Sequence, residues 1–274
     1  TRSNDHQFWD QNVRVIIWDV HHKEINVSQL EGFDCVINLS GANIANQRWS
    51  AEYKQVILDS RIDSVTLLCE AVNKLKNPPK IIFFASAVGY YGVEHPLNRM
   101  FDEQSSPGND FLATVCAQWE AASSQLKVKN TRVIHMRLGA VIGKGGGALA
   151  KMLPVFRLGL GGNLGSGKQW FSWVSINEIP LIIQFLINEG KYNGAVNFVS
   201  QQTITNATFT KALGRVLLRP TLFPFPGFMA KTIFGEMADS LLLKGAHVVP
   251  TRLAQLGYLF KYSDIENTLR EAVR

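Results

Sequence analysis

Short apolar runs alternate with longer segments of helical periodicity along most of the chain, and this alternation restricts the fold more than any other feature. Strand-like runs lie at residues 13–18, 35–39, 81–86, 132–138 and 196–199. Helical patterns occupy residues 51–75, 111–126, 148–157 and 207–217. Strands separated by helices at this spacing form βαβ units, whose crossovers are nearly always right-handed. The sequence therefore predicts an α/β fold with a Rossmann-like, doubly wound parallel sheet.

The pattern changes after about residue 200, where prolines at 220, 224 and 226 interrupt an apolar stretch. Two further helical patterns follow, at residues 229–243 and 263–273. We predict a dinucleotide-binding domain over residues 1–200 and a smaller, mainly helical C-terminal lobe over residues 201–274. Ligands of open parallel sheets bind at the carboxyl ends of the strands, so we expect the site in the loops after Leu39, Ser86 and Leu138.

Composition excludes several classes of partner. No apolar run approaches the roughly 20 residues that a membrane helix needs, so we expect no membrane partner. The net charge is +6, but the lysines and arginines are scattered, and we expect no nucleic-acid partner. The three cysteines form no C-x-x-C pair, which indicates a reduced, cytoplasmic compartment. The six histidines show no metal-binding spacing, and we expect no metal.

Three segments carry a resemblance to a known superfamily. Residues 36–41 (VINLSG) resemble the strand end N-L-A-G, residues 84–92 (FASAVGYYG) resemble S-S-x-x-V-Y-G, and residues 165–174 (GSGKQWFSWV) resemble G-x-G-x-Q-x-R-x-F-V. These patterns are typical of extended short-chain dehydrogenases and epimerases. A narrower resemblance, to the YfcH-like atypical members, comes from Arg48-Trp49, Ser60-Arg61, residues 145–154 (GGGALAKMLP), residues 156–162 (FRLGLGG) and Gly235-Glu236-Met237. It covers nearly the whole chain and implies a Rossmann domain, a small C-terminal lobe and an NADP(H) site, with NADP(H) preferred to NAD(H).

The beginning of the chain departs from this pattern. A dinucleotide site of this kind needs a strand, a glycine-rich turn and a helix whose N-terminus meets the pyrophosphate. Residues 1–3 resemble the segment just after the second strand of the family, so the resemblance leads us to expect that a βαβ-sized piece of about 30 residues is absent ahead of them. We expect that either the sequence is incomplete or the protein cannot hold a dinucleotide in the normal way.

The second departure is chemical. The superfamily uses a tyrosine as acid or base and a lysine four residues later that lowers its pKa. No tyrosine of this chain is followed by lysine at that spacing. Alignment on Trp119-Glu120 places Leu112 at the tyrosine position and Cys116 at the lysine position, and the assisting hydroxyl falls at Ala87. An enzyme of this sequence therefore needs another proton donor.

The resemblance implies a cofactor-binding set at the strand ends. Arg2 is expected to bind the 2′-phosphate of NADP, the alternative being an exposed terminal arginine. Arg61 is expected to face the cofactor, the alternative being a surface charge on a helix. For the other residues of the set, the alternative is an ordinary role in a turn or in the core of a strand. The full predicted set is Arg2, Leu39, Ser40, Gly41, Arg61, Ala85, Ser86, Ala87, Leu138, Gly139 and Val141.

The candidate catalytic groups are Ser86 and Tyr91, although a tyrosine without a nearby lysine keeps a pKa near 10 and is a poor base. For Ser86, a role as a small residue packed beneath the sheet is an equal alternative. The predicted substrate pocket contains Tyr90, Asn109, Cys116, Gln169, Trp170 and Trp173. Packing is an equal alternative for the residues of 169–173, helix capping for Asn109 and a buried thiol for Cys116.

Two functions remain open at this stage. The first is an NADP(H)-binding oxidoreductase or epimerase-like enzyme that acts on a small molecule, either nucleotide-sugar-like or a carbonyl compound. The second is a catalytically inactive dinucleotide-binding sensor or regulatory protein, which the missing Tyr and Lys would equally fit. In either case the expected partner is a small molecule, and self-association into a homodimer is the protein partnership to test.

Overall fold

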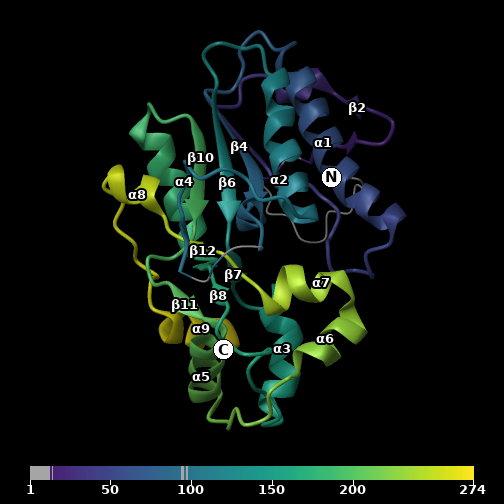
Figure 1. Ribbon diagram of the computed structural model, residues 1–274. Helices are drawn as coiled ribbons and strands as arrows, with labels where there is room; N and C mark the ends of the chain where they lie inside the picture. Colours follow the sequence, from purple (N-terminus) through teal and green to yellow (C-terminus); the bar gives the residue numbers. More distant parts are fainter. Residues whose placement is uncertain (1–12, 14, 94–95, 97) are drawn as a thin grey trace.

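The computed structural model describes residues 13, 15–93, 96 and 98–274. Its centre is a four-stranded parallel sheet in the order β10 (Gly194–Phe198), β6 (Arg132–Leu138), β4 (Ile81–Ala87) and β3 (Cys35–Asn38). In Figure 1 this sheet occupies the upper half of the molecule, and the helices labelled α3, α5, α6, α7 and α9 lie below it.

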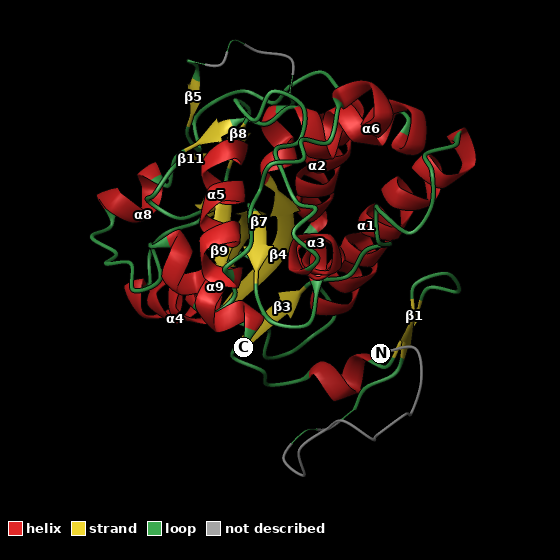
Figure 2. Ribbon diagram, turned by 90° about the horizontal axis from the view of Figure 1, so that it is seen from below, coloured by secondary structure: helices red, strands yellow, loops and turns green. Residues whose placement is uncertain are grey.

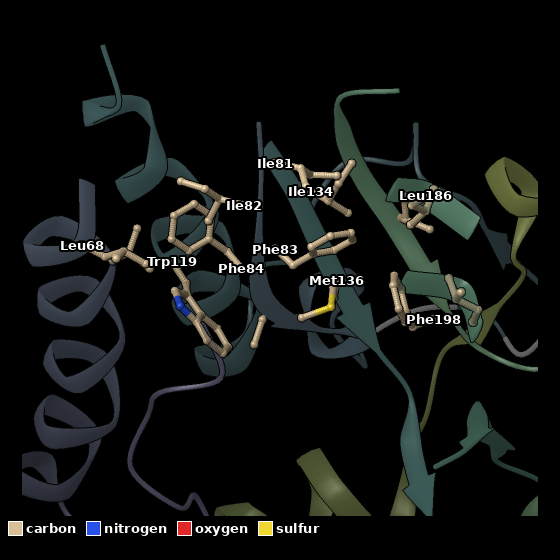
Figure 3. Close-up of a cluster of buried hydrophobic side chains, with 14 of the residues drawn as sticks. Leu68, Ile81, Ile82, Phe83, Phe84, Trp119, Ile134, Met136, Leu186 and Phe198 are labelled. Atoms are coloured by element: carbon tan, nitrogen blue, oxygen red, sulfur yellow. The ribbon is translucent and has the colours of Figure 1, made fainter. Parts of the chain in front are cut away.

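Helices cover both faces of the sheet. The helices α1 (Ala51–Val72) and α2 (Phe111–Ala122) lie on one face, and α4 (Glu178–Glu189) lies on the other, as the view in Figure 2 shows. Alternate residues of a strand point to opposite faces. Accordingly Ile82 and Phe84 lie toward Trp119 of α2, whereas Phe83 and Met136 lie toward the side of Leu186 (Figure 3). The Rossmann-like, doubly wound α/β fold expected from the sequence is confirmed.

Local sequence signals start the main helices. Ser50 accepts a hydrogen bond from the amide of Tyr53 at the start of α1, and Asp110 accepts one from Ala113 at the start of α2. Asp264 caps α9 (Ile265–Val273) in the same way. These side chains satisfy amides that a helix N-terminus leaves without intrahelical partners. The polar turns between apolar runs therefore fix where the helices begin.

The lower part of the molecule has its own hydrophobic core. It is built from α3 (Gly147–Arg157), α5 (Asn206–Leu217) and α9, together with the short strands β7 (Ala140–Ile142) and β9 (Trp173–Ser175). Ile142, Phe156 and Trp173 pack there with Phe209 and Leu269. Segments on both sides of residue 200 thus share one core, and the division at residue 200 stays a prediction.

The remaining strands and helices of the described residues are short. The two-residue strands form three pairs: β1 (Trp18–Asp19) with β2 (Glu24–Ile25), β8 (Trp170–Phe171) with β11 (Ile204–Thr205), and β5 (Met100–Phe101) with β12 (His247–Val248). The short helices are α6 (Gly227–Phe234), α7 (Glu236–Ala238) and α8 (Thr251–Gln255). Single turns occur at η1 (Val27–Leu30), η2 (Val88–Tyr91), η3 (Ser123–Gln125) and η4 (Asp239–Leu243).

Two expectations about local structure were wrong. Among the described residues of the strand expected at 13–18, only Trp18 is in a strand, and it pairs with β2 rather than with the central sheet. The helix expected at 229–243 is divided at Gly235, whose φ of +60° ends α6. The helix α4 was not expected because the run 181–187 is apolar at nearly every position, and such a run does not show helical periodicity.

Across the part of the chain that the structure describes, we find no helix with both the length and the apolar character needed to cross a membrane.

Candidate functional site

The carboxyl ends of β3, β4 and β6 bring most of the predicted cofactor residues to one edge of the sheet. Leu39, Ser40 and Gly41 follow β3 directly. Ala85, Ser86 and Ala87 end β4, and Ala87 lies in register with Leu138, the last residue of β6. Gly139 and Val141 follow on the same connection. The structure thus brings together strand ends that are distant in the sequence, such as Ala87 and Leu138, 51 positions apart.

The loop after β3 is held in place by α1. The amide of Ala42 donates to Ser60 Oγ at 2.9 Å, and Arg61 Nη1 donates to the carbonyls of Ala42 and Ile57 at 3.1 and 2.9 Å. A Cβ on Gly41 would approach the Arg61 side chain at 3.2 Å, so a glycine permits this close packing. Arg61 is half-buried, and its hydrogen bonds to the carbonyls of Ala42 and Ile57 join this loop to α1.

Asn38 has an unused donor at this edge of the sheet. Its Oδ1 accepts the amide of Ser40 at 2.9 Å, but its buried Nδ2 has no partner among the described residues. A buried polar group without a hydrogen bond is costly and calls for an explanation. Beside it the Leu39 side chain is 68% exposed. An unused donor next to an exposed apolar side chain fits a ligand with polar and apolar parts, as a dinucleotide has.

Gly139 is required by close backbone packing. A Cβ at this position would lie 2.7 Å from the carbonyl oxygen of Ser172 and 3.0 Å from Val199. Its amide donates to the carbonyl of Phe198 at 3.1 Å, which joins the end of β6 to the end of β10. The connection after β6 is therefore tightly fixed at the edge where the cofactor is expected.

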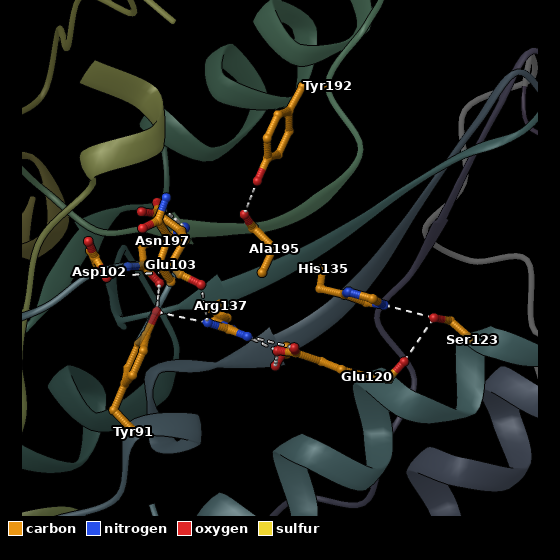
Figure 4. Close-up of polar contacts among 12 residues, drawn as sticks. Tyr91, Asp102, Glu103, Glu120, Ser123, His135, Arg137, Tyr192, Ala195 and Asn197 are labelled. Atoms are coloured by element: carbon orange, nitrogen blue, oxygen red, sulfur yellow. Dashed lines mark hydrogen bonds and ion pairs between the residues drawn. The ribbon is translucent and has the colours of Figure 1, made fainter. Parts of the chain in front are cut away.

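Ser86 is the first member of a buried polar network rather than a free hydroxyl. Figure 4 shows the Glu120, Arg137 and Tyr91 members of this network. The Oγ of Ser86 donates to Glu120 Oε1 at 2.7 Å, and the serine is 2% exposed. The same carboxylate accepts hydrogen bonds from Arg137 Nε and Nη2 at 2.9 and 2.8 Å, which makes a bidentate ion pair between β6 and α2. Burial alone would lower the pKa of Arg137, but its hydrogen bonds to Glu120 raise it. The arginine is therefore charged throughout the physiological range.

Tyr91 continues this network. Its hydroxyl donates to Asn197 Oδ1 at 2.6 Å and accepts from Arg137 Nη1 at 3.0 Å. Burial raises the pKa of Tyr91 to about 12, despite the nearby arginine. The guanidinium of Arg137 also lies 3.5 Å from the ring centre of Tyr90, a close cation–π contact. At neutral pH the Tyr91 phenol is thus protonated and bonded to two protein groups.

Glu103 ties this network to the C-terminal lobe. Its carboxylate accepts the amides of Asn197 and Arg252 at 3.0 and 3.1 Å, and its burial raises its pKa. Neither Glu103, Glu120, Arg137 nor Asn197 was in the set expected from the sequence. The one signal available was a charged residue, Arg137, near the carboxyl end of a predicted buried strand.

The two positions of the missing catalytic pair are packed and apolar. Leu112 and Cys116 are both buried on α2. A Cβ on Gly89 would lie 3.4 Å from the Cβ of Leu112 and 3.8 Å from the Sγ of Cys116. Burial raises the pKa of the Cys116 thiol to about 12, so it is not a thiolate at neutral pH. This part of the site offers no acid or base.

The predicted substrate residues divide into two groups. Tyr90 and Cys116 lie with the network described above, and Asn109 is an exposed neighbour of the capping Asp110. Trp170 stacks on His247, with ring centres 3.8 Å apart and an interplanar angle of 16°. Gln169 donates to the carbonyls of Leu164 and Leu242, and Trp173 lies in the lower core. Arg2 lies outside the described residues.

Other potential sites are sparse. Within the described residues, no group of three or more His, Cys, Asp or Glu side chains is arranged to hold a metal ion. Two shallow surface grooves, of about 320 and 310 Å³, lie along α5 and α9. Neither groove is lined by a residue of the predicted site.

Comparison with known proteins identifies relatives over nearly the whole chain. Residues 1–198 match the model of the NAD dependent epimerase/dehydratase family, and residues 225–272 match a domain of unknown function, DUF1731. The epimerase family protein Mb2239 of Mycobacterium bovis is 38% identical over 96% of this chain and 84% of its own. Mouse epimerase family protein SDR39U1 is also 38% identical, over 91% of this chain and 85% of its own.

Solved structures give the same relationship. The crystal structure of human SDR39U1 with NADPH superimposes with a TM-score of 0.83 at 35% identity, covering 87% of this chain and 81% of that one. A nucleoside-diphosphate sugar epimerase from Corynebacterium glutamicum gives a TM-score of 0.73 at 28% identity, over 94% of this chain and 49% of that longer one. By the extent of the family match and the identity to these relatives, the chain belongs to the NAD dependent epimerase/dehydratase family.

Proposed function

We propose that the protein binds NADP(H) at the carboxyl ends of β3, β4 and β6 and acts as an oxidoreductase or epimerase-like enzyme. The proposed substrate is a small molecule, either a carbonyl compound or a nucleotide-sugar-like compound. The observation that carries the proposal is the arrangement at this edge, with the unpartnered Nδ2 of Asn38 beside the exposed Leu39 and the tightly packed Gly139. The NADPH in the related human structure supports the choice of NADP(H) over NAD(H).

The chain's own residues would hold and orient this cofactor. Ser40 and Gly41 would contact it through the loop that Ser60 and Arg61 support. Gly139 allows the connection after β6 to pass close to Ser172, which leaves the sheet edge without an intervening side chain. When bound, the cofactor supplies hydride transfer, and the protein supplies orientation and electrostatics.

The proton must come from a group other than the usual pair. The hydroxyls of Ser86 and Tyr91 are already bonded to Glu120, Asn197 and Arg137. Tyr90 is half-buried and lies directly over the Arg137 guanidinium. In this proposal Tyr90, a water molecule or a group of the substrate itself transfers the proton, while Ser86 and Tyr91 keep the surrounding loop in place.

A second candidate function is a dinucleotide-binding sensor without catalysis. The observation that favours it is the apolar character of the three positions at which related enzymes place their acid–base groups. Ala87, Leu112 and Cys116 occupy those positions, and the thiol is neutral at physiological pH. Such a protein would bind the cofactor and change its stability without turning over a substrate. The cytoplasmic location is part of either proposal and is supported by three unpaired thiols.

The decisive experiment is thermal unfolding with NADPH, with NADH and without ligand, followed by a screen of carbonyl compounds for NADPH oxidation. Human SDR39U1 serves as the positive control. Binding at a ligand concentration of 100 times Kd adds about 2.7 kcal/mol of stability. We expect a clear shift with NADPH and a smaller one with NADH. A shift with turnover supports the enzyme, a shift without turnover supports the sensor, and no shift with either nucleotide refutes both.

A further inference from the structure

A surface at the end of the molecule away from the four-stranded sheet carries exposed apolar side chains. It is formed by the end of α3 with the residues that follow, and by the loop between α5 and α6 (Figure 1). Its apolar members are between 48% and 85% exposed: Val155, Leu158, Leu160, Leu218, Leu222 and Phe223. We call these six residues, together with Arg157 and Arg219, the basic apolar tip. Scattered exposed leucines are normal, but a contiguous group indicates an interaction surface.

Backbone contacts join the two segments of the tip. Arg219 Nε donates to the carbonyl of Arg157 at 2.8 Å, and the amide of Phe223 donates to the carbonyl of Gly161 at 3.3 Å. A Cβ on Gly159 would lie only 3.7 Å from the Pro220 ring. The two segments are therefore side by side, and their exposed side chains form one surface rather than two.

Leu218 is the most unusual member of the tip. It follows the last residue of α5 with φ +55° and ψ +44°, the left-handed conformation in which glycine is the usual residue. A leucine is disfavoured there, because its Cβ lies too close to the following carbonyl oxygen. Its side chain is also 85% exposed, so burial offsets none of this cost. Folding does not explain a leucine at this position, whereas contact with an external apolar phase would.

The two segments that form the tip carry positive charge and no carboxylate. The sequence contains no aspartate or glutamate in residues 121–177 or in residues 190–235, the two stretches from which the tip is built. The same stretches contribute the two exposed cations of the tip, Arg157 at the end of α3 and Arg219 just after α5. Among the described residues, Arg157 and Arg219 form no ion pair with a carboxylate. The surface therefore complements a partner that is both apolar and anionic.

A second copy of this chain fits that description poorly. A two-fold interface places the same patch on both sides, so cations would face cations with no carboxylate between them. An anionic lipid surface fits well, because apolar side chains enter the interfacial region while arginines bind the phosphates of the headgroups. Leu218 and Leu222 lie on a loop that can enter that region without rearrangement of the core.

We propose that the basic apolar tip docks the protein reversibly onto an anionic lipid surface. The contact is peripheral, with the two loops at the headgroup boundary and no segment crossing the bilayer. The expectation of no membrane partner rested on the lack of a spanning run, which a peripheral contact does not need. This inference is independent of the proposed cofactor site, which lies at the edge of the sheet.

The test is sedimentation of the protein with vesicles of phosphatidylcholine alone and of phosphatidylcholine mixed with phosphatidylserine. We expect binding only to the mixed vesicles, and release as salt is raised. Arg157→Gln and Arg219→Gln should each weaken binding about fivefold, as expected for one cation near an anionic surface. The variant Leu218→Gly/Leu222→Ser should weaken it by at least about tenfold, because two apolar side chains no longer enter the interface. The glycine relieves the left-handed backbone, so this variant keeps its fold.

Matched control variants distinguish binding through the basic apolar tip from nonspecific binding to vesicles. Leu259→Ser removes an equally exposed leucine, 85% exposed and outside the tip, and Lys74→Gln removes an exposed cation of α1's C-terminal turn. Both should bind vesicles as the unmodified protein does. Equal binding to neutral vesicles, no binding to either kind, or the same loss in the control variants would overturn the proposal. Dimers in light scattering that disappear in the Leu218→Gly/Leu222→Ser variant would also overturn it, in favour of a second copy.

Discussion

Arg137 of β6 and Glu120 of α2 form a bidentate ion pair that is almost completely buried, with exposed side-chain fractions of 4% and 11%. The pair closes the gap between a central strand and the helix that covers it, and the same carboxylate also receives the Ser86 hydroxyl. Taking two charges out of water is costly, and the cost is recovered only when every hydrogen-bonding group has a partner. The dense bonding of this network meets that condition.

Removing one partner of this pair should destabilise the protein strongly. We expect Arg137→Met or Glu120→Gln to lower the free energy of unfolding by about 3–5 kcal/mol, because the remaining group loses its compensation. The double variant should cost less than the sum of the single ones. The measurement is urea denaturation of all three variants. Lys80→Met, which breaks the exposed pair with Asp34, is the control and should leave the free energy of unfolding nearly unchanged.

The same network explains what could and could not be read from the sequence. The strands at 81–87 and 132–138 follow from apolar runs between turn residues, and these signals are local. Arg137 was visible as a charge inside a strand, but its partner lies on a helix 17 residues earlier. Which carboxylate it meets depends on how α2 is rotated against the sheet, and that rotation is set by packing around Trp119 and Phe84 rather than by any motif.

The aromatic segment at 169–173 shows a second limit of prediction from the sequence. The spacing placed Trp170 and Trp173 together in one candidate pocket. In the structure they separate, because Trp173 points into the lower core while Trp170 stacks on His247 from the C-terminal lobe. Alternation along an extended segment predicts opposite directions, but the partners that cover each side come from other elements, such as His247 for Trp170 and Phe209 for Trp173. The sequence alone could not assign those partners.

Tyr91 should make stability depend on alkaline pH. Its pKa rises from 10.0 to about 12 on folding. A raised tyrosine pKa means that the folded state holds the proton more tightly, so this stabilisation is complete below pH 10 and is lost between about pH 10 and 12. The amount is about 3 kcal/mol, since one pKa unit corresponds to about 1.4 kcal/mol.

The variant Tyr91→Phe tests this dependence. At pH 7 it should be less stable by about 1–3 kcal/mol, because Asn197 and Arg137 lose a buried partner. As the pH rises toward 12, the unmodified protein should lose its advantage and the difference should shrink. Equilibrium unfolding at a series of pH values measures the difference directly. A gap that stays constant or widens would show that the Tyr91 phenol titrates normally.

Thiol chemistry should distinguish the three cysteines. Cys69 and Cys116 are 0% and 4% exposed, and burial raises the pKa of each thiol to about 12. Cys35 is only half-buried. A thiol-specific reagent at neutral pH should therefore react with Cys35 alone in the native protein and with all three cysteines after unfolding. Cys35→Ser should abolish the native signal and Cys116→Ser should leave it unchanged. Rapid native labelling of Cys116 would show that its thiol is accessible and reactive in the folded protein.

Gly139→Ala should damage the proposed cofactor edge without altering its chemistry. The new methyl group would lie 2.7 Å from the Ser172 carbonyl oxygen and 3.0 Å from Val199, so the connection after β6 must shift. Overpacking of this kind costs about 1–3 kcal/mol. If the cofactor binds at this edge, the same shift should weaken the binding of NADPH by more than tenfold. Gly227→Ala in α6 is the matched control, because its methyl group would meet only Leu243 at an ordinary 3.5 Å. Calorimetric titration with NADPH, together with urea denaturation, separates the two effects. A destabilised Gly139→Ala that still binds NADPH with unchanged affinity would move the cofactor away from the end of β6.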